Sequence, residues 1–232
     1  MVFISEKGRL ALFLALTFAV CMPTWANDSK KEEKKESVKL EAREIFKKLD
    51  VAALEILQPS ARMDMLDYWD ADSVYKASNA MEGLSWLDYV DENYLKVNVT
   101  KVSTFEIKIL PYKHEELVMT IYTVGAEAQS SDSQINFYDA ELKQLETRKF
   151  FDDPELKDFF EIPKGSITTM KEVREMIPFP TVAYTATAES NDLQAILTVK
   201  EFLNEDDWNI IKLFLKPSIT LEWKKDKYKY QK

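Results

Sequence analysis

The chain has 232 residues, a formal net charge of −9, one histidine, one cysteine and four glycines. An acidic chain without clustered Lys and Arg excludes nucleic acid as a partner, because phosphate backbones are bound by concentrated positive charge. The lone histidine excludes an HExxH site, and the lone histidine and cysteine exclude a Cys2His2 zinc site. Removal of Cys21 with an N-terminal leader would also exclude a Cys–His nucleophile pair. The glycines lie too far apart to form a phosphate-binding loop.

The first 26 residues have the pattern of a secretory signal peptide. Lys7 and Arg9 supply positive charge, Leu10–Val20 is an uncharged apolar run, and Ala26 is a small residue suited to cleavage before Asn27. The apolar run is too short to span a bilayer, which takes about 20 helical residues. No later uninterrupted run is longer, so no transmembrane segment is expected after cleavage. The sequence thus predicts an exported protein, periplasmic or secreted.

Cys21 offers a weaker alternative, a lipoprotein anchored through this residue. Such signals need a small residue just before the cysteine, and Val20 stands there. Residues 27–37 mix positive and negative charges and contain no apolar residue. They predict a flexible charged leader ahead of the globular part.

Two helices are expected next. Val38–Leu49 carries apolar residues at helical spacing and predicts an amphipathic helix. A second apolar run, Val51–Leu57, ends before Pro59, and Ser60 is suited to cap another helix with its hydroxyl. On that helix an apolar stripe is expected to face the core, while charged residues face solvent or pair. The stripe is Met65, Leu66 and Trp69, and the charged residues are Arg62, Asp64 and Asp67.

The pattern then changes to strands. Leu95–Val99 and Phe105–Ile109 alternate apolar and polar residues, which predicts half-buried strands joined by a turn at Thr100–Thr104. Leu117–Val124 is apolar on both faces and predicts a central strand. A polar loop then leads to a further strand at Gln134–Tyr138.

Short helices alternate with strands in the C-terminal part. Asp153-Pro154 has the form of a helix start, and Thr169 with Glu172 has the form of a capping box. A hairpin, a helix capped by Asn204 and a last strand are expected to follow. The hairpin covers residues 181–189 and 192–199, and the last strand is Ile219–Trp223.

This order of elements predicts an α+β fold, with N-terminal helices packed on a mainly antiparallel sheet and short helices in the C-terminal part. We expect a single globular domain over residues 38–223, with a subdivision near residues 150–165 as the alternative. Residues 224–232 are basic and rich in tyrosine, which predicts a frayed tail. After cleavage no cysteine remains, so the core alone must stabilise the domain.

Carboxylate chemistry is what the composition leaves open. Two positioned acids can hydrolyse a glycosidic bond without histidine. Each candidate group of acids also has a structural explanation, such as capping a helix or lying in its first turn. The groups are Asp70 with Asp72, Asp152 with Asp153, and Glu205 with Asp206 and Asp207.

Two single residues are also candidates. His114 lies in a polar turn, no G-x-S-x-G motif accompanies it, and we expect it to be structurally idle. Trp86 lies where periodicity is weakest and is the best candidate for a ligand contact, since an aromatic face can stack on a sugar ring. No residue is assigned to catalysis, to a cofactor or to a metal.

Three segments resemble a known family: Arg62–Tyr68, the run from Asn93 to Pro111, and Thr123–Gly125 followed by Asp132–Tyr138. They resemble an uncharacterised family of exported Bacteroidales proteins, catalogued as domain of unknown function 3256. The resemblance implies a bacterial envelope or secreted setting and carries no activity. In that setting, the tripeptide around Ser73 resembles an Asp-Ser/Thr-aliphatic acceptor for O-glycosylation.

Two functions remain. The first is an exported non-catalytic module that binds a protein or polysaccharide of the envelope, or supports an assembly there. It predicts an exposed apolar or aromatic patch. The second is a glycan-directed hydrolase built on a carboxylate pair, which predicts two acids in one cleft with Trp86 at its lip. The missing nucleophile pairs, metal clusters and phosphate loops favour the first, so an enzyme is the less favoured interpretation.

Overall fold

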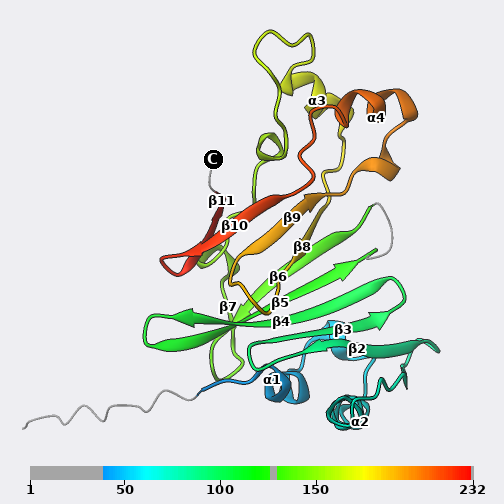
Figure 1. The fold of residues 1–232 in the computed structure, drawn as a ribbon, viewed down its shortest axis with the longest axis vertical. Coiled ribbons are helices and arrows are strands. Elements are labelled where there is room, and N and C mark those ends of the chain that lie inside the picture. The colour runs from blue at the N-terminus through cyan, green and yellow to red at the C-terminus, as the bar shows by residue number, and fades with distance from the viewer. Residues whose placement is uncertain (1–38, 126–129, 231–232) are drawn as a thin grey trace, which may run out of the picture. The chain divides into compact units, whose positions relative to one another are not determined.

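Two antiparallel sheets and four α-helices form the part of the chain that the structure, a computed structural model, describes: residues 39–125 and 130–230 (Figure 1). The fold is α+β, with more sheet than helix. The predicted cleavage site at Ala26 and Asn27, the alternative lipid site at Cys21, and the leader over residues 27–37 lie outside the described residues.

The long sheet has seven strands in sequence order, each antiparallel to the next. Its central strands β4 and β5 pair over their whole length, from Ser103 opposite Val124 to Tyr112 opposite Glu115. The strand predicted to be central, Leu117–Val124, belongs to β5 and is buried along most of its length. The seven strands are β1 Ala77–Ser78, β2 Leu84–Val90, β3 Tyr94–Thr100, β4 Ser103–Tyr112, β5 Glu115–Val124, β6 Asp132–Tyr138 and β7 Gln144–Leu145.

Two N-terminal helices, α1 (Ala42–Lys48) and α2 (Pro59–Asp70), lie on one face of this sheet with the 3-10 turn η1 (Ala52–Leu54) between them (Figure 1). Their apolar side chains share a core with side chains of β2 to β5. Helix α2 begins at Pro59 with Gln58 as its N-cap, so the prediction that Ser60 caps it is wrong. Proline is suited to the first helical position, because its missing N–H has no partner there anyway.

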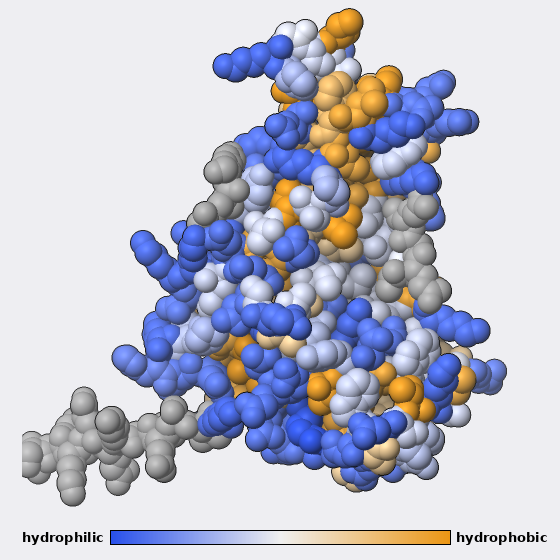
Figure 2. Space-filling model, viewed as in Figure 1, coloured by the Kyte–Doolittle hydropathy of each residue, from blue (hydrophilic) through white to orange (hydrophobic). Residues whose placement is uncertain are grey.

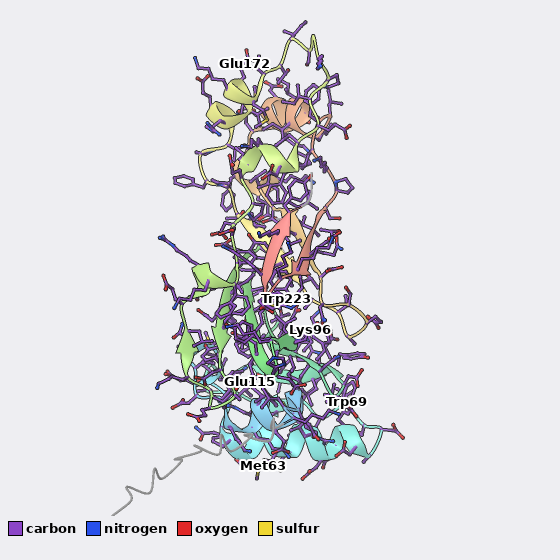
Figure 3. All side chains as sticks on the ribbon, turned by 90° about the vertical axis from the view of Figure 1, so that its left-hand side faces the viewer. Met63, Trp69, Lys96, Glu115, Glu172 and Trp223 are labelled. Atoms are coloured by element: carbon purple, nitrogen blue, oxygen red, sulfur yellow. The ribbon has the colours of Figure 1, made fainter. Side chains whose placement is uncertain are left out.

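A second sheet, in the order β11-β10-β9-β8, shares a core with the opposite face of the long sheet. Figure 3 shows Trp223 of this sheet between Trp69 on α2 and Glu172 on α3. The Trp223 indole N–H donates to the Pro111 carbonyl at the end of β4, at 3.1 Å. The strands are β8 Val182–Thr185, β9 Leu193–Leu197, β10 Ile219–Lys224 and β11 Lys227–Tyr230; the remaining elements are η2 Thr147–Lys149, η3 Leu156–Phe159, α3 Met170–Met176, η4 Lys200–Phe202 and α4 Glu205–Ile211.

Helix capping in this part is partly as predicted. Thr169 caps α3 in a capping box with Glu172, and the Asn204 side chain accepts from the Asp207 backbone N–H at 2.8 Å. The predicted helix start at Asp153 is wrong, because the short helix η3 begins later, with Glu155 as its N-cap. Asp158 Oδ2 accepts from the Glu155 backbone N–H at 3.0 Å as part of a capping box, which places the helix start at Glu155.

The polar side of β4 is not exposed, although its alternation predicts a half-buried strand. Glu106 is 2% exposed and Lys108 is 1% exposed. Both point toward the second sheet, which covers a face that the period of the strand marks as polar. Both side chains bind backbone groups of residues 186–188, which follow β8, and these hydrogen bonds offset part of the cost of burying the charges.

The segment predicted to be a frayed basic tail contains strand β11, which pairs with β10. Tyr228 is fully buried, its backbone N–H donates to the Phe150 carbonyl at 2.8 Å, and its hydroxyl donates to the Asn191 carbonyl at 2.7 Å. The packed body therefore extends beyond Trp223. In Lys227–Tyr230 tyrosines alternate with lysines, so one strand face is aromatic and the other is charged. The lysines give the segment the composition of a solvated tail.

Replacing Tyr228 with phenylalanine is expected to lower the free energy of unfolding by about 1 kcal/mol, because the Asn191 carbonyl then loses its buried donor. Tyr68→Phe is the matched control, since Tyr68 is 48% exposed on α2. Urea unfolding of both variants measures the difference. Equal stability of the two variants would mean that the hydrogen bond from the Tyr228 hydroxyl to the Asn191 carbonyl does not stabilise the protein.

Candidate functional site

Side chains of the long sheet cap the free edge of β8. Strand β8 pairs with β9 on one side only, so alternate backbone N–H groups on its other side have no strand partner. The Val182 N–H donates to Asp132 Oδ1 at 3.2 Å, and the Tyr184 N–H donates to Ser133 Oγ at 3.0 Å. Such capping satisfies an edge that would otherwise be open to pairing with another chain.

Glu106 caps a third backbone N–H group, that of Ala186, just after the end of β8. Its Oε2 accepts from the Ala186 N–H at 2.9 Å and from the Tyr94 hydroxyl at 3.0 Å. Burial raises the pKa of the Glu106 carboxyl to about 7, although the Ala186 hydrogen bond and nearby Lys96 oppose this shift. Glu106 therefore changes protonation near neutral pH, inside the contact between the sheets.

Lys108 holds the segment that follows β8. Its ammonium donates to the backbone carbonyls of Thr187 at 2.7 Å and Ala188 at 3.1 Å. Burial lowers the pKa of Lys108, because a charged ammonium is poorly solvated there. Glu106 and Lys108 thus connect the two sheets through hydrogen bonds to backbone groups of residues 186–188. Their role is structural, and neither side chain lines the groove or the pocket described below.

One acid of each predicted group has a partner outside the pocket described next. Asp70 Oδ2 accepts from Arg43 at 2.6 Å, Asp152 forms an ion pair with Lys227 at 2.7 Å, and Asp207 accepts from the Asn204 amide at 2.7 Å. Asp153 is different. It lines a pocket of about 260 Å³ between the sheets together with Asp132, a pairing that no sequence pattern predicts. The Tyr184 hydroxyl, in the same pocket, donates to Asp153 Oδ1 at 3.4 Å.

The remaining candidates lie apart from these sites. Trp86, on β2, is half-buried, and the Lys76 ammonium lies 5.2 Å from its ring centroid. Trp86 lines neither the pocket between the sheets nor the groove described next. Ser73 is exposed just after α2. His114 is exposed in the tight turn between β4 and β5.

A polar groove of about 620 Å³ lies on the helix-bearing face of the long sheet. The main contacts of α1 and α2 with the sheet are to β1–β4. The groove is formed between residues 50–53 and strands β4 to β7. We call it the amide groove, after its three amide side chains. These are Gln134, Asn136 and Gln144.

An apolar surface lies over the C-terminal helices, and Figure 2 shows apolar side chains gathered there. We call it the apolar end. It is defined by four large side chains on or just after α3, η4 and α4 and in the loop before α3. Their exposed fractions are 95% for Ile167, 71% for Phe179, 47% for Phe202 and 72% for Leu213.

Metal and membrane sites find no support within the described residues. No group of three His, Cys, Asp or Glu side chains there could hold a metal ion. Across residues 39–125 and 130–230, no helix combines the length and apolarity needed to cross a bilayer.

Comparisons with known proteins give a family and a fold, without an activity. No curated protein matches the sequence. A domain of an uncharacterized protein from Porphyromonas gingivalis W83 has a similar structure, with a TM-score of 0.69 and 21% sequence identity over 83% of this chain and 100% of that chain. At this identity the likeness shows the fold alone. The family model "Protein of unknown function (DUF3256)" matches residues 35–228. The chain therefore belongs to the DUF3256 family.

Proposed function

We propose that the protein is an exported, non-catalytic module that binds a protein partner of the cell envelope through the apolar end. The observation that carries the proposal is the apolar surface over the C-terminal helices in Figure 2. Four large apolar side chains on or next to these helices, Ile167, Phe179, Phe202 and Leu213, are each at least 47% exposed. Single exposed apolar residues are ordinary, whereas a gathered set marks an interaction surface. The leader pattern in residues 1–26 supports export.

The chemistry near the apolar end favours an acidic partner. A groove of about 500 Å³ next to α4 is lined by Trp208 and Ile196 together with Lys200 and Lys212. The Lys200 ammonium lies 5.8 Å from the Trp208 ring centroid. A groove that combines apolar side chains with lysines suits a partner that offers apolar side chains next to carboxylates.

Replacing Leu213 or Ile167 with glutamate is expected to weaken capture of this partner at least about tenfold, because a charge on the apolar surface must be desolvated and also repels an acidic partner. Met81→Glu is the matched control, since Met81 is 67% exposed next to β2. The measurement is quantitative crosslinking of the exported protein in intact envelopes, with N-terminal sequencing to show a start at Asn27.

Crosslinked adducts that persist equally in Leu213→Glu, Ile167→Glu and Met81→Glu would overturn the proposed surface. A polypeptide that begins at Met1 in the cytosol would overturn the proposed location. Thermal unfolding of each variant checks that it is folded. Because all three positions are exposed, we expect the variants to fold like the wild type.

A glycan-directed hydrolase using a carboxylate pair is the second candidate. The observation in its favour is that Asp132 and Asp153 line one pocket between the sheets. Asp132 is also engaged as a cap for the Val182 N–H. Release of reducing ends from a polysaccharide, lost in both Asp132→Asn and Asp153→Asn, would favour this candidate over the binding module.

A further inference from the structure

The amide groove follows from the register of three strands. Because paired residues of neighbouring strands share a sheet face, Tyr122 lies beside Gln134, Thr120 beside Asn136, and Tyr138 beside Gln144. These six residues all line the groove. One face of β5, β6 and β7 thus presents hydroxyl and amide groups, where the same face of β3 and β4 is apolar and covered by helix.

One amide contact orients the floor of the groove. The Gln144 Nε2 group donates to Asn136 Oδ1 at 3.1 Å. This bond leaves the Asn136 amide N–H groups and the Gln144 carbonyl oxygen for other partners, since each amide carries two donors and an acceptor. Gln134 is exposed, and the structure shows no hydrogen bond from its side chain to another described residue. The floor therefore offers both donors and acceptors to a ligand.

The charge of the lining narrows the class of ligand. Among the described residues that line the groove, Asp50 alone is charged, and no Lys or Arg is present. A phosphate, sulfate or carboxylate ligand calls for cationic or converging N–H donors, as in arginine forks. A neutral ligand rich in hydroxyl groups fits, because each hydroxyl both donates and accepts.

Apolar and aromatic side chains also line the groove. Phe105, Val51 and Leu142 line the groove beside the polar groups, and Tyr122 and Tyr138 supply aromatic rings. Burial raises the pKa of Tyr138, so its hydroxyl stays neutral. At about 620 Å³ the groove lies within the usual size range of small-molecule sites, and its lining mixes apolar side chains with hydroxyl and amide groups. Sugar rings combine apolar C–H faces with hydroxyl edges.

We infer that the amide groove is a binding site for a neutral saccharide. The inference is independent of the proposed protein partner, because the groove and the apolar end share no residue. Asn136 and Gln134 are assigned to hydrogen bonds with the sugar hydroxyls, and Tyr122 to contact with the ring, because Tyr138 is only 5% exposed.

The test is a binding screen of the full exported chain against immobilised oligosaccharides. The panel holds neutral glucans, mannans and galactans, with uronate-bearing and sulfated glycans as the charged arm. We expect neutral glycans to bind, with an affinity that is insensitive to salt, since no ion pair is involved. Asn136→Ala and Gln134→Ala are each expected to weaken binding about tenfold, as for loss of a ligand hydrogen bond.

Asn209→Ala is the matched control, because this exposed amide lies on α4 outside the groove. Gln134 is exposed, so Gln134→Ala tests the site even if Asn136→Ala unfolds. A panel without any neutral binder overturns the inference. So does neutral binding that Gln134→Ala leaves unchanged, or tighter binding of the charged glycans. None of these outcomes bears on the Leu213→Glu and Ile167→Glu experiment.

Discussion

Replacing Arg62 with methionine is expected to lower the free energy of unfolding by about 3–5 kcal/mol, the largest effect of any single substitution considered for this protein. Arg62 is 5% exposed, and its guanidinium donates to four backbone carbonyls. The distances are 2.8 Å to Leu49, 2.8 Å to Leu54, 3.3 Å to Phe46 and 3.3 Å to Leu57.

These carbonyls lie at or just after the C-terminal ends of α1 and η1, where a helix leaves its last acceptors without intrahelical donors. The Arg62 guanidinium supplies the missing donors. One side chain therefore links α1, η1 and α2. Methionine fills similar volume but leaves the buried acceptors without donors. Lysine keeps the charge, yet it lacks the planar fork that reaches several carbonyls at once, so Arg62→Lys is expected to recover only part of the loss.

Arg43→Met is the matched control. Arg43 forms an ion pair with Asp70 at 2.6 Å, with side chains 31% and 53% exposed. A surface pair of this kind contributes about 0–1 kcal/mol. Chemical denaturation of the three variants measures the difference. If Arg62→Met lost no more than Arg43→Met, the carbonyl contacts would not be holding the helices together.

Glu106→Gln is expected to remove a pH dependence of stability centred below neutral pH. In the folded protein the pKa of Glu106 is about 7, against an ordinary value of 4.5. Between these values the folded state binds more protons than the unfolded state, so the free energy of unfolding falls as the pH rises. The stabilisation is complete below pH 4.5 and is lost as the pH passes through about 7.

The expected loss is about 3 kcal/mol, since each pH unit of differential protonation is worth about 1.4 kcal/mol. Glutamine has the same shape, keeps an acceptor for the Ala186 N–H and cannot ionise. Urea unfolding at pH 5 and at pH 8 compares the wild type with Glu106→Gln and with Glu161→Gln, a control at an exposed acid. If Glu106→Gln lost as much free energy of unfolding between pH 5 and pH 8 as the wild type does, other groups would be responsible for the pH dependence.

Much of the fold could be predicted because local rules govern it. Period-two alternation located β3, the all-apolar run located β5, and side-chain capping at Thr169 and Asn204 located α3 and α4. Each of these signals depends on residues within a few positions of one another, so no long-range contact is needed to interpret it.

The misjudged residues all owe their environment to distant parts of the chain. Arg62 has the polar character of a surface helix residue, and only the carbonyls of three other segments make it an interior one. Glu106 and Lys108 alternate like solvent-facing residues, and the second sheet, formed some 80 positions later, buries them. Tyr228 lies among lysines, and its pairing with β10 is invisible without the sheet.

The candidate sites show the same division. Composition by itself argued against a Cys2His2 or HExxH zinc site, because each of these needs more than one histidine. The strand pattern determined an α+β fold. The amide groove and the apolar end, however, were decided only by tertiary structure. Strand register brings Gln134, Asn136 and Gln144 onto one face, and packing of the C-terminal helices leaves Ile167 and Leu213 exposed. Burial and proximity are properties of the folded chain, and a linear pattern cannot encode which face a distant segment will cover.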